Sequence, residues 1–111
     1  MKIIIIGAGA AGLMAATGAA DALKGSGKVI VLEKMPRPGR KIMITGKGRC
    51  NFTNMKEWNE FSAHIYPKPS FLKHSFYNLT PEKMLDFLAV NGMESVIERG
   101  DRAFPASHLA S

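Results

Sequence analysis

Three glycines near the N-terminus, Gly7, Gly9 and Gly12, have the spacing G-x-G-x-x-G. The first permits a tight turn, the second lets backbone approach a diphosphate without a Cβ in the way, and the third lets a helix pack closely on a strand. The helix that would start here, at about Ala11 next to Ala10, offers unpaired N–H groups and a partial positive charge. These residues predict a phosphate-binding turn, although a purely structural glycine turn has the same pattern.

A single carboxylate stands where it could recognise the sugar of a bound nucleotide. Glu33 closes the next predicted strand, 21 positions after Gly12, and can accept hydrogen bonds from the 2′- and 3′-hydroxyls of an adenosine ribose. It would repel a 2′-phosphate, which argues against NADP at this site. The alternative is a surface ion pair between Glu33 and Lys34. The pattern predicts dinucleotide binding and leaves FAD and NAD open, because both contain an ADP half.

Cations alternate with glycines in a second stretch, GRKIMITGKGRCNFTN, which covers residues 39–54. Its glycines are Gly39, Gly46 and Gly48, and its cations are Arg40, Lys41, Lys47 and Arg49. Cys50 and Asn51 follow the last of these cations. Exposed backbone among cations is typical of an anion-binding loop, and a solvated basic turn is the alternative. Cys50 is the only cysteine of the chain, so we expect no internal disulfide and a packed thiol without a redox role.

The chain has 111 residues and a net charge of +6, with an ordinary apolar content of 46%. Such a charge could indicate binding to nucleic acid or to an acidic membrane. The basic residues are scattered, however, so a solvated surface and an anionic cofactor explain it better, and we expect neither partner. Residues 1–20 imitate a secretory signal or a short membrane span, but most of them are Gly and Ala. With one cysteine, a cytoplasmic protein is expected.

The elements that would position the first set of residues form a βαβ unit. Ile3–Ile6 is a β-branched run typical of a strand buried on both faces of a parallel sheet. Residues 11–24 read as an Ala-rich helix in which Gly18 is expected to allow a close backbone approach. Val29–Leu32 is a second apolar strand. This order predicts an α/β fold, the incomplete N-terminal part of a Rossmann-like FAD/NAD(P)-binding fold, with a helical segment and a short hairpin to follow.

The middle of the chain is less regular. Residues 36–48 read as a long loop that a strand-like KIMIT segment, residues 41–45, could interrupt. Residues 56–63 are ambiguous between loop and helix, and residues 70–79 are expected to form a short helix. The inward-facing residues of that short helix are expected to be Phe71, Leu72 and Phe76.

The last third has clearer signals. A helix is predicted to begin after Thr80, a good N-cap residue, with Pro81 at the first helical position, and to stop at Asn91–Gly92. Residues 94–105 then read as two short strands around a turn at Gly100–Asp101. Ser107–Ser111 would begin another helix.

Four strings occur in a characteristic order: GAGAAG, LEK, GRKIMITGKGRCNFTN and GDRAFPAS. In this respect the chain resembles the BaiN-like (YhiN-like) family of FAD-dependent oxidoreductases, which belong with the two-dinucleotide-binding-domain flavoproteins. The GRK…TGKGRCN string is far more specific than the glycine spacing, and RAFPAS is a second marker. The resemblance covers the whole chain, whereas the members of the family are several times longer.

The resemblance implies roles for individual residues. Glu33 would contact the adenosine ribose, with Lys34 beside it as a backbone or adenine-edge neighbour. Gly39, Arg40 and Lys41 would lie along the diphosphate and the ribityl chain, with Arg40 donating to a phosphate oxygen. The segment from Gly48 through Cys50 to Asn51 would reach toward the isoalloxazine ring. Lys41, Lys47 and Arg49 could offset the remaining negative charge, one of them near the flavin N1 side.

The resemblance also implies an activity. Residues 1–111 would form the N-terminal part of the FAD-binding domain of an oxidoreductase that transfers a hydride from NAD(P)H through FAD to an organic acceptor, such as a steroid-like enone. The rest of that domain and the substrate domain would lie outside the sequence, so the piece alone is expected to be inactive and to self-associate or bind FAD weakly. Alternatives are another flavoprotein oxidase or dehydrogenase, a non-catalytic nucleotide-binding piece, or a basic nucleic-acid-binding module. No catalytic residue is selected, and the three histidines lack metal-ligand spacing.

Overall fold

The computed structural model describes residues 1–109 and divides into two compact units. The first is Met1–Ile44 and the second begins at Thr45. The first unit carries seven Lys and Arg against two Asp and Glu, whereas the second carries eight against seven. The positive charge of the chain is therefore concentrated in the unit that contains the G-x-G-x-x-G turn.

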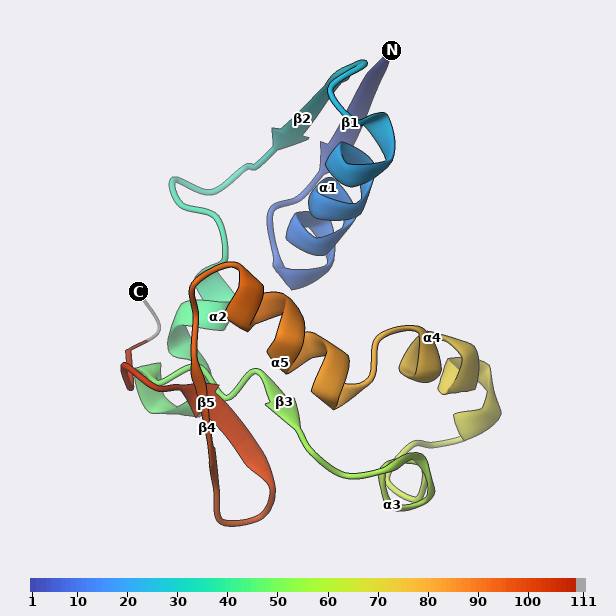
Figure 1. The fold of residues 1–111 in the computed structure, drawn as a ribbon, viewed down its shortest axis with the longest axis vertical. Coiled ribbons are helices and arrows are strands. Elements are labelled where there is room, and N and C mark those ends of the chain that lie inside the picture. Colours follow the sequence, from blue (N-terminus) through green and yellow to red (C-terminus); the bar gives the residue numbers. More distant parts are fainter. Residues whose placement is uncertain (110–111) are drawn as a thin grey trace. The chain divides into compact units, whose positions relative to one another are not determined.

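The first unit contains the predicted βαβ motif. Its strands are β1 (Lys2–Ile6) and β2 (Lys28–Leu32), joined through helix α1 (Ala10–Leu23). The strands pair in parallel, with Lys2 opposite Lys28 and Ile6 opposite Leu32, and α1 packs along both (Figure 1). Parallel pairing needs such a crossover, because a tight hairpin can join only antiparallel strands. The predicted strand–helix–strand order is confirmed.

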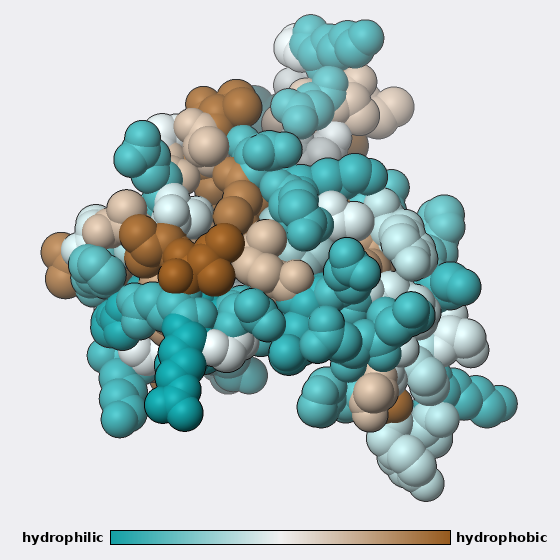
Figure 2. All heavy atoms as spheres, turned by 60° about the horizontal axis from the view of Figure 1, so that its bottom comes forward, coloured by the Kyte–Doolittle hydropathy of each residue, from teal (hydrophilic) through white to brown (hydrophobic). Residues whose placement is uncertain are grey.

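The expectation that Ile3–Ile6 is buried on both faces is wrong for the described residues. Ile3 and Ile5 are half-buried, whereas Ile4 is 60% and Ile6 86% exposed. Successive strand residues point to opposite faces, and α1 covers only one of them. The opposite face is left open, and other large apolar side chains also reach the surface, where they appear brown in Figure 2.

The segment expected to be a loop with a strand-like interruption is partly helical. Residues 34–38 are irregular, but Arg40–Ile44 forms the short helix α2, followed by η1, a tight turn at Thr45–Gly48. The helix begins where the N–H of Met43 donates to the carbonyl oxygen of Gly39, at 3.1 Å. A short β-branched run does not distinguish a strand from one turn of helix, and no neighbouring strand edge holds it extended.

The second unit has the following elements after η1: β3 (Thr53–Asn54), α3 (Trp58–Ser62), η2 (Pro69–Leu72), α4 (Lys73–Asn78), α5 (Pro81–Val90), β4 (Ser95–Glu98) and β5 (Arg102–Pro105). Thr80 caps α5, because its hydroxyl oxygen accepts the N–H of Lys83, and Pro81 is the first helical residue, as predicted. Ser107 and its neighbours up to Leu109 are not helical, and the rest of the helix predicted there lies outside the described residues.

The three strands of this unit form an antiparallel sheet in the order β3-β5-β4. The hairpin β4–β5 was predicted, and it pairs Val96 with Phe104 and Glu98 with Arg102. The strand β3 was not predicted, because two residues are too few to show any periodicity. It pairs Thr53 with Ala103 on the other edge of β5.

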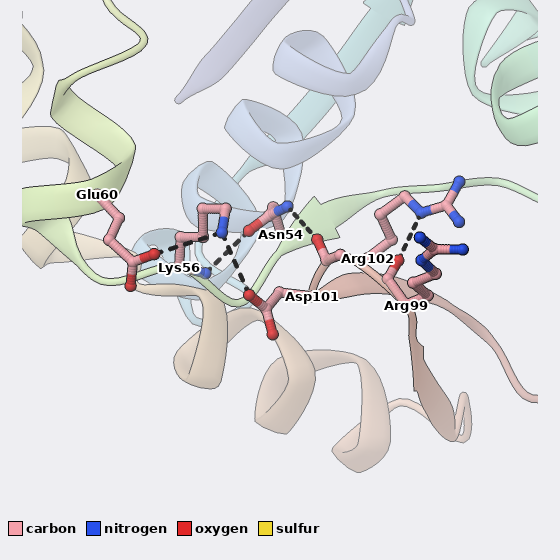
Figure 3. Close-up of polar contacts among 7 residues, drawn as sticks. Asn54, Lys56, Glu60, Arg99, Asp101 and Arg102 are labelled. Atoms are coloured by element: carbon pink, nitrogen blue, oxygen red, sulfur yellow. Dashed lines mark hydrogen bonds and ion pairs between the residues drawn. The ribbon is translucent and has the colours of Figure 1, made fainter.

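Side chains that precede α3 fasten the turn of this hairpin (Figure 3). The amide nitrogen of Asn54 donates to the carbonyl oxygen of Gly100 at 3.0 Å, and its oxygen accepts the N–H of Lys56 at 2.9 Å. The Lys56 ammonium group lies 3.3 Å from the carboxylate of Asp101 and 3.4 Å from that of Glu60. Hydrogen bonds from Lys56, first to Asp101 and then to Glu60, raise the pKa of its ammonium group above 10.5.

The helices α3 and α4 meet through aromatic rings. Phe76 lies 5.4 Å from Trp58 and 5.1 Å from Phe61 between ring centroids, so it faces inward as predicted. The same expectation is wrong for Phe71, which is 85% exposed, and for Leu72, which is 37% exposed. The chain leaves helical periodicity at η2, and a pattern counted through residues 70–79 therefore fails there.

No helix within residues 1–109 combines the length and the apolar character that crossing a membrane requires.

Replacing Gly18 by Ala should stabilise the chain, contrary to the close approach expected from the sequence. A Cβ at Gly18 would meet no atom within 4 Å, and the residue lies in the interior of α1. Glycine there costs about 1 kcal/mol relative to alanine. We expect Gly18→Ala to raise the free energy of unfolding by about that amount in a denaturant titration. A loss of stability would show that another part of the protein packs against this position.

Candidate functional site

The glycine turn between β1 and α1 has the geometry that its spacing predicts. Gly7 has φ +97°, a conformation that other L-residues rarely adopt. A Cβ on Gly12 would lie 1.9 Å from the carbonyl oxygen of Gly7, so the close packing of helix and strand requires glycine there. A Cβ on Gly9 would meet no atom within 4 Å, which leaves its backbone open to a ligand. Each glycine thus has the property that the phosphate-binding interpretation assigns to it.

Ala8, at the centre of this turn, is held from two sides. Its N–H donates to Oε2 of Glu33 at 2.7 Å, and its carbonyl oxygen accepts the N–H of Gly39 at 2.7 Å. Ala8 is only 3% exposed. Three segments that are distant in the sequence, the glycine turn, the end of β2 and the start of α2, therefore meet at the backbone of one residue. The sequence gives no signal for Ala8 itself, because it contributes only backbone.

Glu33 is fixed by backbone groups and does not form the alternative ion pair with Lys34. Its second oxygen, Oε1, accepts the N–H of Met35 at 2.8 Å. Hydrogen bonds from Met35 and then from Ala8 lower the pKa of the Glu33 carboxyl below its ordinary value of 4.5. An ionised carboxylate has about four acceptor positions, so these N–H groups leave acceptor capacity for a ribose hydroxyl.

The first turn of α1 supplies donors for an anion. Within the described part of the chain, the N–H groups of Ala10, Ala11 and Gly12 have no hydrogen-bond partner, and Ala10 and Ala11 are exposed. No side chain caps this helix end, because its N-cap residue is Gly9. Arg40 and Lys41 follow Gly39 in exposed positions, and Lys34 is exposed beside Glu33. Free N–H groups, nearby cations and a carboxylate that can accept further hydrogen bonds fit the diphosphate and ribose of a dinucleotide.

The remaining predicted site residues belong to the second unit. Gly48 is exposed with φ +83°, and Cys50 is 7% exposed with φ +59°, its N–H donating to the carbonyl oxygen of Thr45 at 3.0 Å. The thiol is thus packed, as predicted. The Asn51 amide nitrogen can donate to the carbonyl oxygens of Ala103, at 3.3 Å, and Thr53, at 3.1 Å. Asn51 therefore ties its loop to β5 and β3.

Arg49 has partners that the sequence did not suggest. Its guanidinium donates to the carboxylate of Glu98 and lies 4.3 Å from the ring centroid of Phe104. Its Nη2 is also 3.1 Å from Nδ1 of His108. The hydrogen bond from Arg49 is the main reason why the pKa of Glu98 lies below its ordinary value of 4.5. Nothing in the local pattern could pair residues this far apart in the chain.

A cleft of about 300 Å³ lies elsewhere in the second unit, among α3, α4 and the start of α5. Trp58, Phe76 and Tyr77 line it, together with the polar residues Lys56, Glu57, Asn59, Thr80 and Glu82. Of the two tyrosines of the chain, Tyr77 borders this cleft, whereas Tyr66 is 94% exposed.

The whole chain, residues 1–111, matches the family described as HI0933-like protein Rossmann domain. The chain belongs to this family. The resemblance seen in its motifs, to the BaiN-like (YhiN-like) flavoproteins, is confirmed, and so is the Rossmann-like α/β fold. HI0933-like proteins are FAD-binding flavoproteins, which favours FAD over NAD for the site around Ala8 and Glu33.

Three curated relatives extend this finding. The ribosomal RNA dihydrouridine synthase of Escherichia coli is 37% identical over 90 residues, which are 81% of this chain and 21% of that protein. The ribosomal RNA dihydrouridine synthase of Haemophilus influenzae is 36% identical over 90 residues, which are 81% of this chain and 21% of that protein. The 3-dehydro-bile acid delta(4,6)-reductase of Clostridium scindens is 36% identical over 110 residues, 99% of this chain and 26% of that protein. The chain thus spans about a fifth to a quarter of the length of these relatives.

Glu33→Gln should weaken the glycine turn even before any ligand binds. Glutamine offers one carbonyl oxygen to two N–H donors, and its NH₂ group would face one of them. We expect a lower melting temperature than in the wild type at about pH 7, where the carboxylate is ionised. Lys34→Gln, an adjacent exposed change, is the control and should have little effect.

The pH dependence of the melting temperature should show that the carboxylate of Glu33 is the group responsible. Because the pKa of Glu33 is lower in the folded chain, its contribution to stability is present above about pH 4.5 and is lost as the pH falls through the folded-state pKa. The difference in melting temperature between wild type and Glu33→Gln should therefore shrink on acidification below pH 4.5. A difference that did not change with pH would contradict the hydrogen bonds assigned to this carboxylate.

Proposed function

We propose that this chain forms the N-terminal, FAD-binding part of a longer oxidoreductase that adds hydrogen across a carbon–carbon double bond conjugated to a carbonyl group. The observation that carries the proposal is the assembly around Ala8, which joins a phosphate-binding turn to a ribose-binding carboxylate in a chain of a flavoprotein family. NAD(P)H is the proposed electron donor, and a cytoplasmic location is proposed with it.

The residues have distinct proposed tasks in cofactor binding. The N–H groups of Ala10 and Ala11 would bind phosphate oxygens, and Glu33 would accept hydrogen bonds from the ribose while holding the turn in place. Arg40 and Lys41 would offset the negative charge of the diphosphate. The segment that contains Gly48 and Asn51 would lie toward the flavin ring. When bound, FAD supplies the capacity to accept a hydride from the nicotinamide and to pass it to the substrate.

The names of the relatives suggest the type of double bond. Making dihydrouridine saturates the C5–C6 double bond of uracil, which is conjugated to a ring carbonyl, and a delta(4,6)-reductase of a 3-dehydro bile acid acts on double bonds conjugated to a 3-keto group. Both reactions add a hydride and a proton to a conjugated double bond. That shared chemistry supports the general proposal, and a steroid-like enone remains one candidate acceptor for this protein.

A uracil base in ribosomal RNA is the second candidate acceptor. Two of the three relatives carry that activity in their names, and the chain has a net charge of +6. The expectation that nucleic acid is not a partner stays a prediction, and these names weigh against it. A polyanionic substrate would make activity fall steeply with salt, whereas a steroid would not.

The test uses the full-length protein. It should purify with flavin absorption, and NADH or NADPH should bleach that absorption under anaerobic conditions. Adding the acceptor should restore it, and the two candidates are compared by adding a steroid enone or a ribosomal RNA transcript that contains unmodified uridine. Protein that is colourless, and whose melting temperature FAD does not raise, would disprove the proposal. Reoxidation by oxygen or quinone alone would favour an oxidase or a dehydrogenase.

Cys50→Ser in the full-length protein should bind FAD and turn over nearly as well as the wild type. Cys50 is packed and is the single cysteine of these 111 residues, so the chain provides no second thiol for a disulfide-based redox step. Flavin content and the rate of flavin reduction by NAD(P)H measure the outcome. A slower reduction at unchanged flavin content would assign the thiol a role in the reaction.

A further inference from the structure

The two most specific sequence markers, GKGRCN and RAFP, form one substructure. The N–H of Phe52 donates to the carbonyl oxygen of Ala103 at 3.1 Å, and Thr53 pairs with Ala103 between β3 and β5. A Cβ on Gly46 would lie 3.0 Å from the ring of Phe104 and 2.8 Å from the backbone nitrogen of Asn51. The loop of residues 46–51, here called the cationic loop, therefore rests directly on β5.

The side chain of Arg49 joins this loop to both strands of the hairpin. It stacks on Phe104, which is 2% exposed, and pairs with Glu98 on the neighbouring strand β4. Its guanidinium thus contacts both strands of the hairpin at once. Such a planar group can stack and donate hydrogen bonds simultaneously, which a lysine ammonium group cannot do.

The charge of Arg49 is already offset within the second unit, unlike that of Lys47. Glu98 accepts a charge-assisted hydrogen bond from Arg49. Lys47 is exposed and has no acidic partner among residues 1–109. Of the two cations in the cationic loop, Lys47 is therefore the one whose charge is available to an anionic ligand.

We propose that Arg49 is a positioning residue, which fastens the cationic loop to the β4–β5 hairpin through Glu98 and Phe104 and does not itself contact the cofactor. The inference rests on the proposed function, in which this loop faces the flavin. It assigns Glu98 and Phe104 to the same task and leaves Lys47 as the cation of the loop that acts on the ligand by its charge.

The experiment compares variants of the full-length protein by their dissociation constant for FAD, by the visible circular dichroism of the bound flavin and by thermal unfolding. Arg49→Lys keeps the charge but loses the stacking geometry, and Glu98→Ala removes the partner. Arg49→Met combined with Glu98→Ala tests whether the two residues act together. Arg99→Met is the matched control, because Arg99 is an exposed arginine of the same hairpin (Figure 3).

We expect Arg49→Lys and Glu98→Ala each to weaken FAD binding about tenfold and to alter the flavin dichroism, since each releases the loop. The double variant should be no worse than Arg49→Met alone, and Arg99→Met should match the wild type. Lys47→Met should also weaken FAD binding, because it removes the charge. Lys47→Arg keeps the charge and should bind FAD as the wild type does. Melting temperatures close to the wild type for Arg49→Lys and Glu98→Ala exclude general unfolding as the cause.

Two results would overturn the inference while leaving the proposed function intact. If Arg49→Lys binds FAD like the wild type and Glu98→Ala is harmless, Arg49 acts by its charge on the cofactor. If the Arg49 and Glu98 variants all behave like Arg99→Met, the loop does not need this fastening. A wild-type protein that binds no FAD would instead disprove the proposed function, and the inference with it.

Discussion

The backbone of Ala8 is the point on which the first unit depends. Its N–H is held by the carboxylate of Glu33 and its carbonyl oxygen by the N–H of Gly39. Buried backbone N–H and C=O groups without partners cost free energy, so this arrangement is favoured as soon as the three segments meet. It fixes the glycine turn, the end of β2 and the start of α2 in one geometry. The residues proposed to bind phosphate and ribose are therefore set in place by backbone hydrogen bonds within their own unit.

Burial in both units is concentrated at the sequence markers. Among the described residues, the buried ones are Ala8, Gly39, Cys50, Pro81, Ala103, Phe104 and Pro105, and all except Pro81 lie in the GAGAAG, GRKIMITGKGRCN and RAFP strings. By contrast, one face of the β1–β2 sheet is open, with Ile6 largely exposed. The chain spans about a fifth to a quarter of its relatives. The motifs thus mark the parts of the chain that pack well within these 111 residues.

In the second unit, Arg49 shows that a cationic side chain in a predicted anion-binding loop does not always have its charge available for the anion. The sequence groups Arg49 with Lys41 and Lys47 as cations able to offset a diphosphate. The structure gives Arg49 a carboxylate and an aromatic ring as partners, and leaves Lys47 exposed. The two cations of one loop therefore differ in what they can do, because only one of them has its charge matched within the fold.

The sequence by itself determined the features that depend on neighbouring residues. The G-x-G-x-x-G spacing, the β-branched strands, the Thr80–Pro81 helix start and the Gly100–Asp101 turn each act within a few positions, and each was predicted correctly. The conformations required of Gly7, Gly9 and Gly12 could be predicted for the same reason, whereas ribose binding by Glu33 stays a prediction. Membership of the flavoprotein family followed from the order of the four strings.

Only the tertiary structure decided the features that depend on distant residues. The double hold on Ala8, the pairing of Arg49 with Glu98 and the strand β3 all join segments that no local pattern connects. The helix α2 and the exposed side chains of Ile4 and Phe71 were missed for a related reason. Whether a short apolar segment is helical, extended or exposed depends on what packs against it, and side-chain type alone does not specify that partner.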